Sequence, residues 1–174
     1  HFKIIKKTEK FVSNVKLNRT SYTYTGKTIR PSVTVTVNGK KIGASAYKLY
    51  YKNNKNSGIG TVQVRGTGKY SRINKTITFK ILPPKTLLTG LKKANRSFIA
   101  SWKKNIQATG YQIQYAASRS MRGSRTVSAS ALTRTLSGLK KGSTYYVRIR
   151  AYKKVSGKTY YGAWSSVKNV KVRK

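Results

Sequence analysis

Side chains that could carry out acid–base, nucleophilic or metal chemistry are almost absent from this chain of 174 residues. Glu9 is the single acidic residue, His1 is the single histidine, and there is no cysteine. Glycosidases and aspartic proteases need two carboxylates, so both classes are excluded, and a histidine triad would depend on the first residue of the sequence. A Ser–Lys dyad is formally open, but no motif supports it. We therefore expect no enzyme and no cofactor, and no metal ion, because zinc and calcium sites need His, Cys or several carboxylates.

The chemistry that remains is that of positive charge. Lys and Arg number 39, which gives a net charge of +38 and an isoelectric point near 11.0. About a quarter of the residues in an average chain are charged, so the unusual feature here is the loss of acids rather than the number of bases. Self-repulsion at this charge favours counter-ions or a polyanionic partner. The alternative explanation is solubility, natural or engineered.

Alternation along residues 144–152 indicates where such a partner would bind. As a strand, this segment turns Tyr145, Val147, Ile149 and Ala151 inward. Outward-facing residues of this strand and of a last strand at 167–173 are Tyr146, Arg148, Arg150, Tyr152, Lys171 and Arg173. If the two strands are neighbours, one sheet face carries four cations beside two tyrosines, which suits phosphate or sulfate backbones. The alternative is a solvated face whose side chains only support strand pairing.

A second group of cations lies nearby in the sequence. Arg119, Arg122, Arg125 and Arg134 could form a loop patch with Met121 that also binds polyanions. Scattered, solvated charge is the alternative.

The elements that position these residues are predicted to be strands. Val33, Val35 and Val37 alternate with threonines and are followed by Asn38-Gly39, a strong hairpin signal. No segment of a dozen residues has helical periodicity, so the expected fold class is all-β, with two tandem β-sandwich domains. No apolar run is long enough for a transmembrane helix. The predicted strands are 32–37, 47–51, 61–65, 75–81, 97–102, 111–115, 125–127, 144–152 and 167–173.

Pro83-Pro84 cannot continue a β-ladder, so the boundary between the two sandwiches is placed at residues 82–86. Residues 11–84 then form the first sandwich and residues 85–174 the second. Residues 1–10 are expected to be a basic arm or an edge strand. Such an arm could join the sheet of a neighbouring molecule and allow self-assembly, or it could pair within its own module.

The second sandwich resembles a fibronectin type III domain. Trp102 ends an early predicted strand, the segment 110–115 follows, and Leu139 and Tyr145 fall at the positions of the tyrosine corner. The segment 160–165, YYGAWS, looks like the version found in exported proteins of Gram-positive bacteria. The first sandwich resembles a bacterial immunoglobulin-like module; the segments that carry this resemblance are 24–27, 31–35, 51–58 and 66–70.

The resemblance implies a secreted protein at the cell surface or outside the cell, and three functions remain open. The first is a basic binding or matrix protein that holds teichoic acid, extracellular DNA or acidic glycans by electrostatics, without sequence preference. The second is a structural subunit of an extracellular filament or sheath. The third is a passive spacer, or a supercharged form of one. Members of these families normally carry several acidic residues, and their absence here weakens the plain spacer reading.

Overall fold

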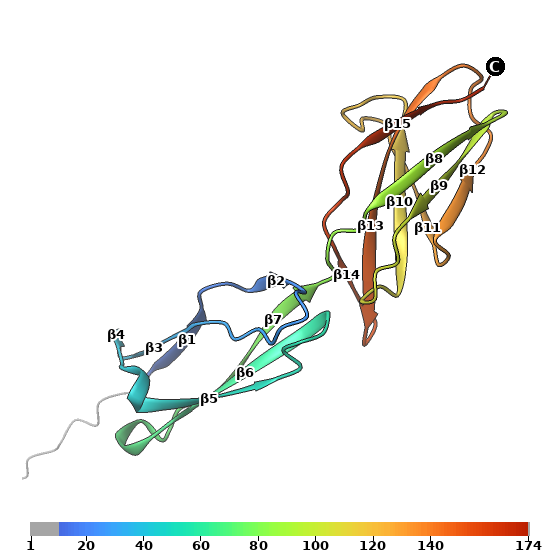
Figure 1. The fold of residues 1–174 in the computed structure, drawn as a ribbon. Coiled ribbons are helices and arrows are strands. Elements are labelled where there is room, and N and C mark those ends of the chain that lie inside the picture. Colours follow the sequence, from blue (N-terminus) through green and yellow to red (C-terminus); the bar gives the residue numbers. More distant parts are fainter. Residues whose placement is uncertain (1–10, 174) are drawn as a thin grey trace, which may run out of the picture.

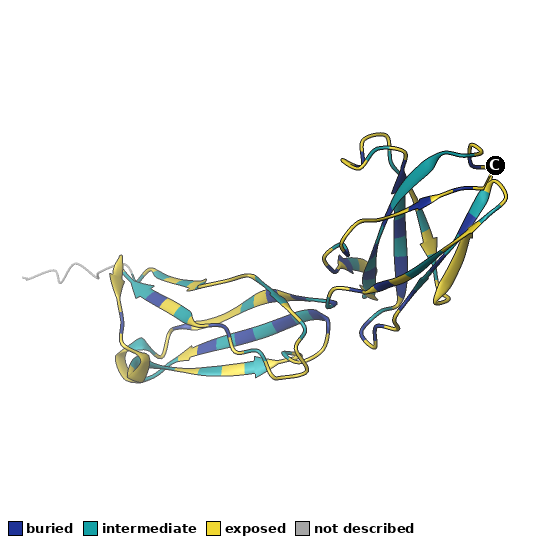
Figure 2. Ribbon diagram, turned by 45° about the horizontal axis from the view of Figure 1, so that its top comes forward, coloured by how far each residue is buried: buried dark blue, intermediate teal, exposed yellow. Residues whose placement is uncertain are grey.

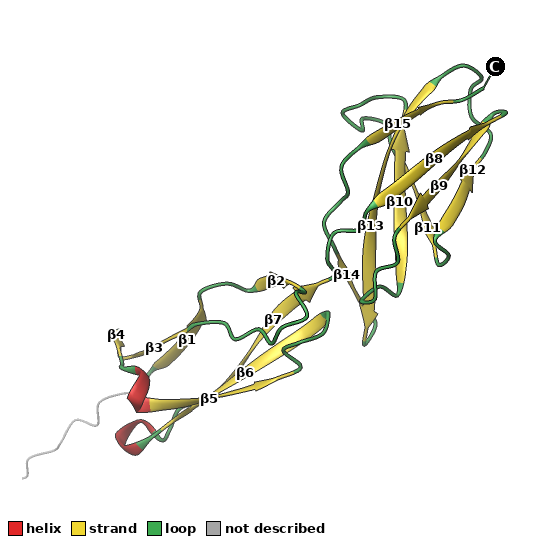
Figure 3. Ribbon diagram, in the orientation of Figure 1, coloured by secondary structure: helices red, strands yellow, loops and turns green. Residues whose placement is uncertain are grey.

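A computed structural model of the chain describes residues 11–173. The predicted arm, residues 1–10, lies outside the described residues. Figure 3 shows that strands make up nearly all of the regular structure in this part, apart from two short 3₁₀ turns at Ala44–Ala46 and Gly68–Tyr70. The strands form two sandwiches that lie end to end (Figure 1), which confirms the all-β class and the tandem arrangement.

The first sandwich packs two sheets against each other, with strand orders β1-β3-β4 and β2-β7-β6-β5. Pairing is antiparallel except between β2 and β7, which run parallel. Phe79 and Ile81 of β7 and Val62 and Val64 of β6 are buried between the sheets, because alternate residues of a strand point to the same face. The strands are β1 (Ser13–Leu17), β2 (Ser21–Thr23), β3 (Val33–Val37), β4 (Lys40–Lys41), β5 (Tyr47–Lys52), β6 (Gly58–Gly66) and β7 (Asn74–Leu82).

The predicted hairpin after residue 37 is present. Asn38 and Gly39 have φ angles of 48° and 81°, and Val37 pairs with Lys40 across the turn. Positive φ at both central residues is what a tight two-residue hairpin requires. The Asn-Gly pair therefore fixes the register of β3 against β4.

The second sandwich has one sheet of order β12-β9-β8 and another of order β11-β10-β13-β14, in which β15 also pairs with β13. Its core contains Phe98, Trp102, Ile113, Val147 and Ile149. Figure 2 shows buried positions alternating with more exposed ones along its strands. The strands are β8 (Leu88–Ala94), β9 (Ser97–Trp102), β10 (Gly110–Ala116), β11 (Arg125–Ala129), β12 (Thr133–Leu136), β13 (Thr144–Val155), β14 (Lys158–Tyr161) and β15 (Lys168–Lys171).

Every predicted strand is present, but the structure adds β1, β2, β4, β8, β12 and β14. β14 occupies part of a segment that was expected to be a loop at Gly157-Lys158. These strands were missed because they are short or because lysines and threonines interrupt their apolar alternation, as in the exposed β12.

The two sandwiches contact each other through hydrogen bonds and close packing. The Ser57 backbone N–H donates to Gln107 Oε1 at 2.9 Å, and the Asn105 side chain donates to the Pro84 carbonyl at 2.8 Å. Ser57, Asn105 and Gln107 are all buried. The hairpin of β13 and β14 extends beyond its own sandwich and reaches β6 and β7. The junction is therefore a packed interface. Among residues 11–173, no helix has the length and apolar character to span a membrane.

Candidate polyanion-binding site

The strand β13 presents the predicted arginines on the outer face of its sheet. Val147, Ile149 and Ala151 are buried, as the alternation predicts, while Arg148 and Arg150 are half-buried on the opposite face. Tyr146 and Tyr152 also lie on this outer face and are half-buried.

Two aromatic residues from beyond β13 cover the arginines. The Cζ atom of Arg150 lies 4.0 Å from the ring centroid of Tyr161 and 4.3 Å from that of Trp164. The Cζ atom of Arg148 lies 4.8 Å from the Trp164 ring, so one indole stacks on both guanidinium groups. Tyr152 packs against Tyr161 at 6.2 Å between centroids and extends the stack. We call Arg148, Arg150, Tyr152, Tyr161 and Trp164 the arginine–aromatic ladder.

Glutamines on the neighbouring strand hold the arginines in place. β10 places Gln114 opposite Arg148 and Gln112 opposite Arg150. Arg148 Nε donates to Gln114 Oε1 at 2.7 Å, and Arg150 donates to Gln112 Oε1 through Nε at 3.0 Å and Nη2 at 2.8 Å. A guanidinium has five N–H donors, so most of those in the ladder make no hydrogen bond within the described residues. An amide orients an arginine without neutralising it.

The surroundings of Arg150 disfavour its charged form. Partial burial lowers the pKa of Arg150 from its ordinary value; the nearby Tyr161 opposes this shift, and the positive charge of Arg148 adds to it. Residues 11–173 contain no Asp or Glu, so no side chain in this part of the chain supplies a counter-charge. An anion bound at the ladder would relieve this imbalance.

The structure brings together only Arg148 and Arg150 of the four cations expected on this face. β15 pairs with the first residues of β13 only, so Lys171 lies on the same face but opposite Thr144, farther along the strand from Arg148. Arg173 belongs to the opposite sheet, because its backbone N–H donates to the Ala94 carbonyl. The chain crosses between the two sheets after β15, and the sequence pattern gave no sign of this crossing.

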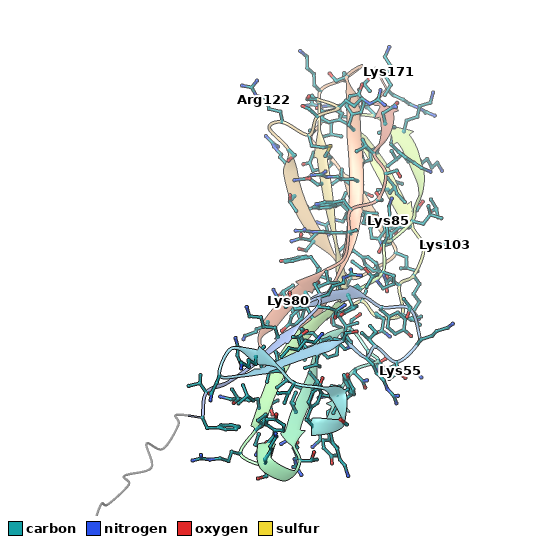
Figure 4. The ribbon with its side chains drawn as sticks, turned by 90° about the vertical axis from the view of Figure 1, so that its left-hand side faces the viewer. Lys55, Lys80, Lys85, Lys103, Arg122 and Lys171 are labelled. Atoms are coloured by element: carbon teal, nitrogen blue, oxygen red, sulfur yellow. The ribbon has the colours of Figure 1, made fainter. Side chains whose placement is uncertain are left out.

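The predicted loop patch is also divided. Arg119 and Arg122 are exposed in the turn between β10 and β11, at the end of the molecule where Figure 4 labels Arg122 and Lys171. Arg125 starts β11 opposite Tyr115 and lines a separate hollow of about 310 Å³ with Lys140. Arg134 lies on β12 in the other sheet. Arg134 therefore lies apart from Arg119, Arg122 and Arg125.

Four residues of the site were not predicted from the sequence: Gln112, Gln114, Tyr161 and Trp164. The glutamines alternate with Tyr111, Ile113 and Tyr115, so their outward direction was readable, but their register against β13 was not. Trp164 follows β14 in a segment without a strand, where no periodicity reveals the direction of a side chain.

The second sandwich also contains the tyrosine corner. The Tyr145 hydroxyl accepts a hydrogen bond from the Lys140 backbone N–H at 3.1 Å, and Leu139 beside it is buried. This bond back to the preceding turn is the signature of the corner, as the resemblance implied.

Among solved structures, the chain is similar to the FN5 domain of Drosophila Lar, with 18% identity, 53% of this chain and 99% of that chain covered, and a TM-score of 0.44. It is similar to the sixth fibronectin type III domain of human fibronectin type III domain containing protein 3, with 16% identity, coverage of 52% and 86%, and a TM-score of 0.44. The FN1–FN3 domains of chicken CNTN1 align with 94% of this chain at 17% identity and a TM-score of 0.49, over 56% of their own length.

No match to the chain was found among curated protein sequences. The sequence model of the fibronectin type III domain, in contrast, matches residues 82–168, which is half of the chain. This chain belongs to the fibronectin type III domain family.

Proposed function

We propose that this chain is a non-enzymatic, highly basic binding protein that associates with polyanions by electrostatics. The observation that carries the proposal is the ladder, where Arg148 and Arg150 are fixed by amides and aromatic rings in a region without carboxylates. Teichoic acid, extracellular DNA and acidic glycans are the partners that fit this charge, and the binding carries no sequence preference.

Using amides in place of carboxylates has a direct consequence for binding. A carboxylate opposite each arginine would form an ion pair that a ligand must first break. Gln112 and Gln114 orient the guanidinium groups and leave their charge available. Because the side chains are already ordered, the ligand loses less of its binding free energy to ordering them. Each guanidinium can then make paired hydrogen bonds to a phosphate or sulfate group.

We further infer that the binding takes place outside the cell, in a secreted or surface protein. Fibronectin type III domains are typical of extracellular proteins and generally act as scaffolds. The segment 160–165 favours an exported protein of a Gram-positive bacterium, and residues 11–84 are assigned to an immunoglobulin-like module by their resemblance.

A spacer is the second candidate, and the packed junction favours it. The buried hydrogen bond between Ser57 and Gln107 would hold two modules in a fixed order along a stalk. In that case the charge serves solubility alone. Assembly into a filament is a further alternative, either by end-to-end joining of the modules or through residues 1–10, which lie outside the described residues.

The test is a salt series of binding to heparin, teichoic acid and duplex DNA. Each lost phosphate contact lowers the slope of log K against log salt by about 0.7–0.9. We expect Arg148→Gln/Arg150→Gln to lower the slope by about 1.4–1.8 on that scale. The control, Lys92→Gln/Lys93→Gln, removes the same charge from exposed positions on β8 in the other sheet and should change the slope little. Equal effects of the two pairs, or no binding at physiological salt, would favour the spacer.

A further inference from the structure

A groove of about 680 Å³ lies where the two sandwiches meet, beside the ladder. The first sandwich lines it with Ile59 of β6 and with Thr78, Lys80 and Leu82 of β7. Lys80 is exposed and is labelled at this level in Figure 4. The second sandwich contributes the four residues of β14, Lys158–Tyr161.

The groove and the ladder share one residue. Tyr161 lines the groove, and its ring also lies 4.0 Å from Arg150 Cζ. Lys154 continues the connection, because it pairs with Thr159 of β14 and its Nζ lies 5.9 Å from the Tyr152 ring. Five cations therefore lie along this path, which we call the row: Lys80 and Lys158 line the groove, and Lys154, Arg150 and Arg148 share one face of β13.

The spacing of this row fits a repeating charge. Alternate residues of a strand point to the same side about 6.5 Å apart. Arg148, Arg150 and Lys154 lie on the same face of β13, so they offer positive charges at multiples of this step. A polymer with one anionic group per repeat unit can follow these charges along the strand and continue into the groove.

The shape of the site favours a single flexible chain over a duplex. The row passes from an open sheet face into a groove between two modules, with Tyr161 at the transition. A DNA duplex stays straight over roughly 50 nm, so it can lie across the sheet face but cannot turn into the groove. A single chain with freely rotating bonds can do both.

We propose that the groove and the ladder form one binding site for a flexible, single-chain polymer carrying phosphate or sulfate groups. This inference rests on the proposed polyanion binding and goes further, because it requires both sandwiches and a minimum length of ligand. The hydrogen bonds of Gln107 and Asn105 across the junction keep the two halves of the site in place. Binding at one half then raises the effective concentration of the polymer at the other.

The experiment measures binding of the whole chain to inorganic polyphosphate and to heparin oligosaccharides, each as a series of defined lengths. Trp164 fluorescence is the readout, because the indole lies in the ladder. The test variant is Lys80→Gln/Lys158→Gln, which changes two exposed groove residues, and the control is Lys92→Gln/Lys93→Gln on β8. Duplex DNA serves as the rigid probe.

We expect affinity to rise with chain length until the ligand spans the row and then to level off. The groove variant should lower the salt slope for long chains by about 1.4, on the scale of 0.7 per contact for single strands. For the shortest chains and for the duplex, the groove variant should change the salt slope no more than the control variant does. A response to only one of the two series would support the site and identify its anion as phosphate or as sulfate.

Two results would overturn the inference. If long chains bind but the groove and control pairs weaken them equally, the composite site does not exist, although the proposed polyanion binding stands. If the groove pair weakens duplex and single chains alike, the site does not select a flexible ligand. Absence of binding to any probe would remove the proposed function and this inference together.

Discussion

Replacing Trp164 tests the ladder most directly. Its ring lies 4.3 Å from Arg150 Cζ and 4.8 Å from Arg148 Cζ. A cation–π contact at an exposed site contributes about 0.5–1 kcal/mol, so the two contacts together supply about 1–2 kcal/mol. We expect Trp164→Ala to lower the free energy of unfolding of the second sandwich by at least this amount. For a domain of this size, each kcal/mol corresponds to a fall in Tm of roughly 4–8 °C.

A double-mutant cycle separates this coupling from the other losses. The arms are Trp164→Ala, Arg148→Gln/Arg150→Gln, and all three changes together. Losses of the hydrogen bonds to glutamine and of the Tyr161 contact cancel, because they occur whenever the arginines are replaced. Urea is the denaturant, since it leaves the ionic strength unchanged, and Trp102, buried in the core of the second sandwich, reports unfolding in every variant.

The expected coupling energy is about 1–2 kcal/mol. If the changes add within about 0.3–0.5 kcal/mol, the limit for independent sites, the stacking of Trp164 on the arginines contributes nothing and the ladder is not a preformed site. A matched control replaces Trp164 by Phe, which keeps an aromatic ring and should retain part of the coupling.

Three further predictions concern the two sandwiches. A Cβ atom at Gly60 would clash with the Phe79 ring in the core, so Gly60→Ala should destabilise the first sandwich by about 1–3 kcal/mol; a urea midpoint equal to that of the wild type would contradict the packing. Tyr145→Phe removes the hydrogen bond from Lys140 N and should cost the second sandwich about 0.5–1.5 kcal/mol in urea unfolding, whereas an unchanged midpoint would show that the corner bond is dispensable. Burial raises the pKa of Tyr51, against the opposing effect of Arg30. The contribution of the neutral Tyr51 hydroxyl to the free energy of unfolding is therefore complete below about pH 10 and is lost as the pH rises through the pKa of Tyr51 in the folded state. Wild-type stability should therefore fall more steeply above about pH 10 than that of Tyr51→Phe, and parallel curves would refute the shift.

Alternation predicted which residues of each long strand lie in the core. Val147, Ile149 and Ala151 are buried on β13, and Val62 and Val64 on β6, because a strand has only two faces and one of them must pack. The positions of turns were also predictable where glycine or asparagine adopts a positive φ, as at Asn38-Gly39.

Pairing between distant strands was not predictable in the same way. The site depends on Gln112 and Gln114 meeting Arg150 and Arg148, and on Trp164 folding back over both. A shift of register by two residues would keep every residue on its face and still change each pair. The position of Arg173 shows the same limit, because the crossing of the chain to the other sheet depends on packing rather than on periodicity.

The absence of acidic residues between positions 11 and 173 also keeps the side-chain charge of both sandwiches nearly constant between about pH 3 and 9. This part of the chain contains no carboxylate side chain and no histidine, so no side chain with an ordinary pKa between about 3 and 9 is present in it. Acid unfolding driven by protonation of paired carboxylates has no counterpart in these domains. Any change in binding between about pH 3 and 8 must then come from the ligand, outside the contributions of His1, Glu9 and the α-amino and α-carboxyl groups of the chain that is measured. A binding curve with a midpoint near pH 6 would indicate that the polymer carries phosphate monoesters, and a midpoint near pH 4 would indicate carboxylates. Binding that does not change with pH would indicate phosphodiesters or sulfates. A pH titration of the complex therefore identifies the anionic group of the polymer.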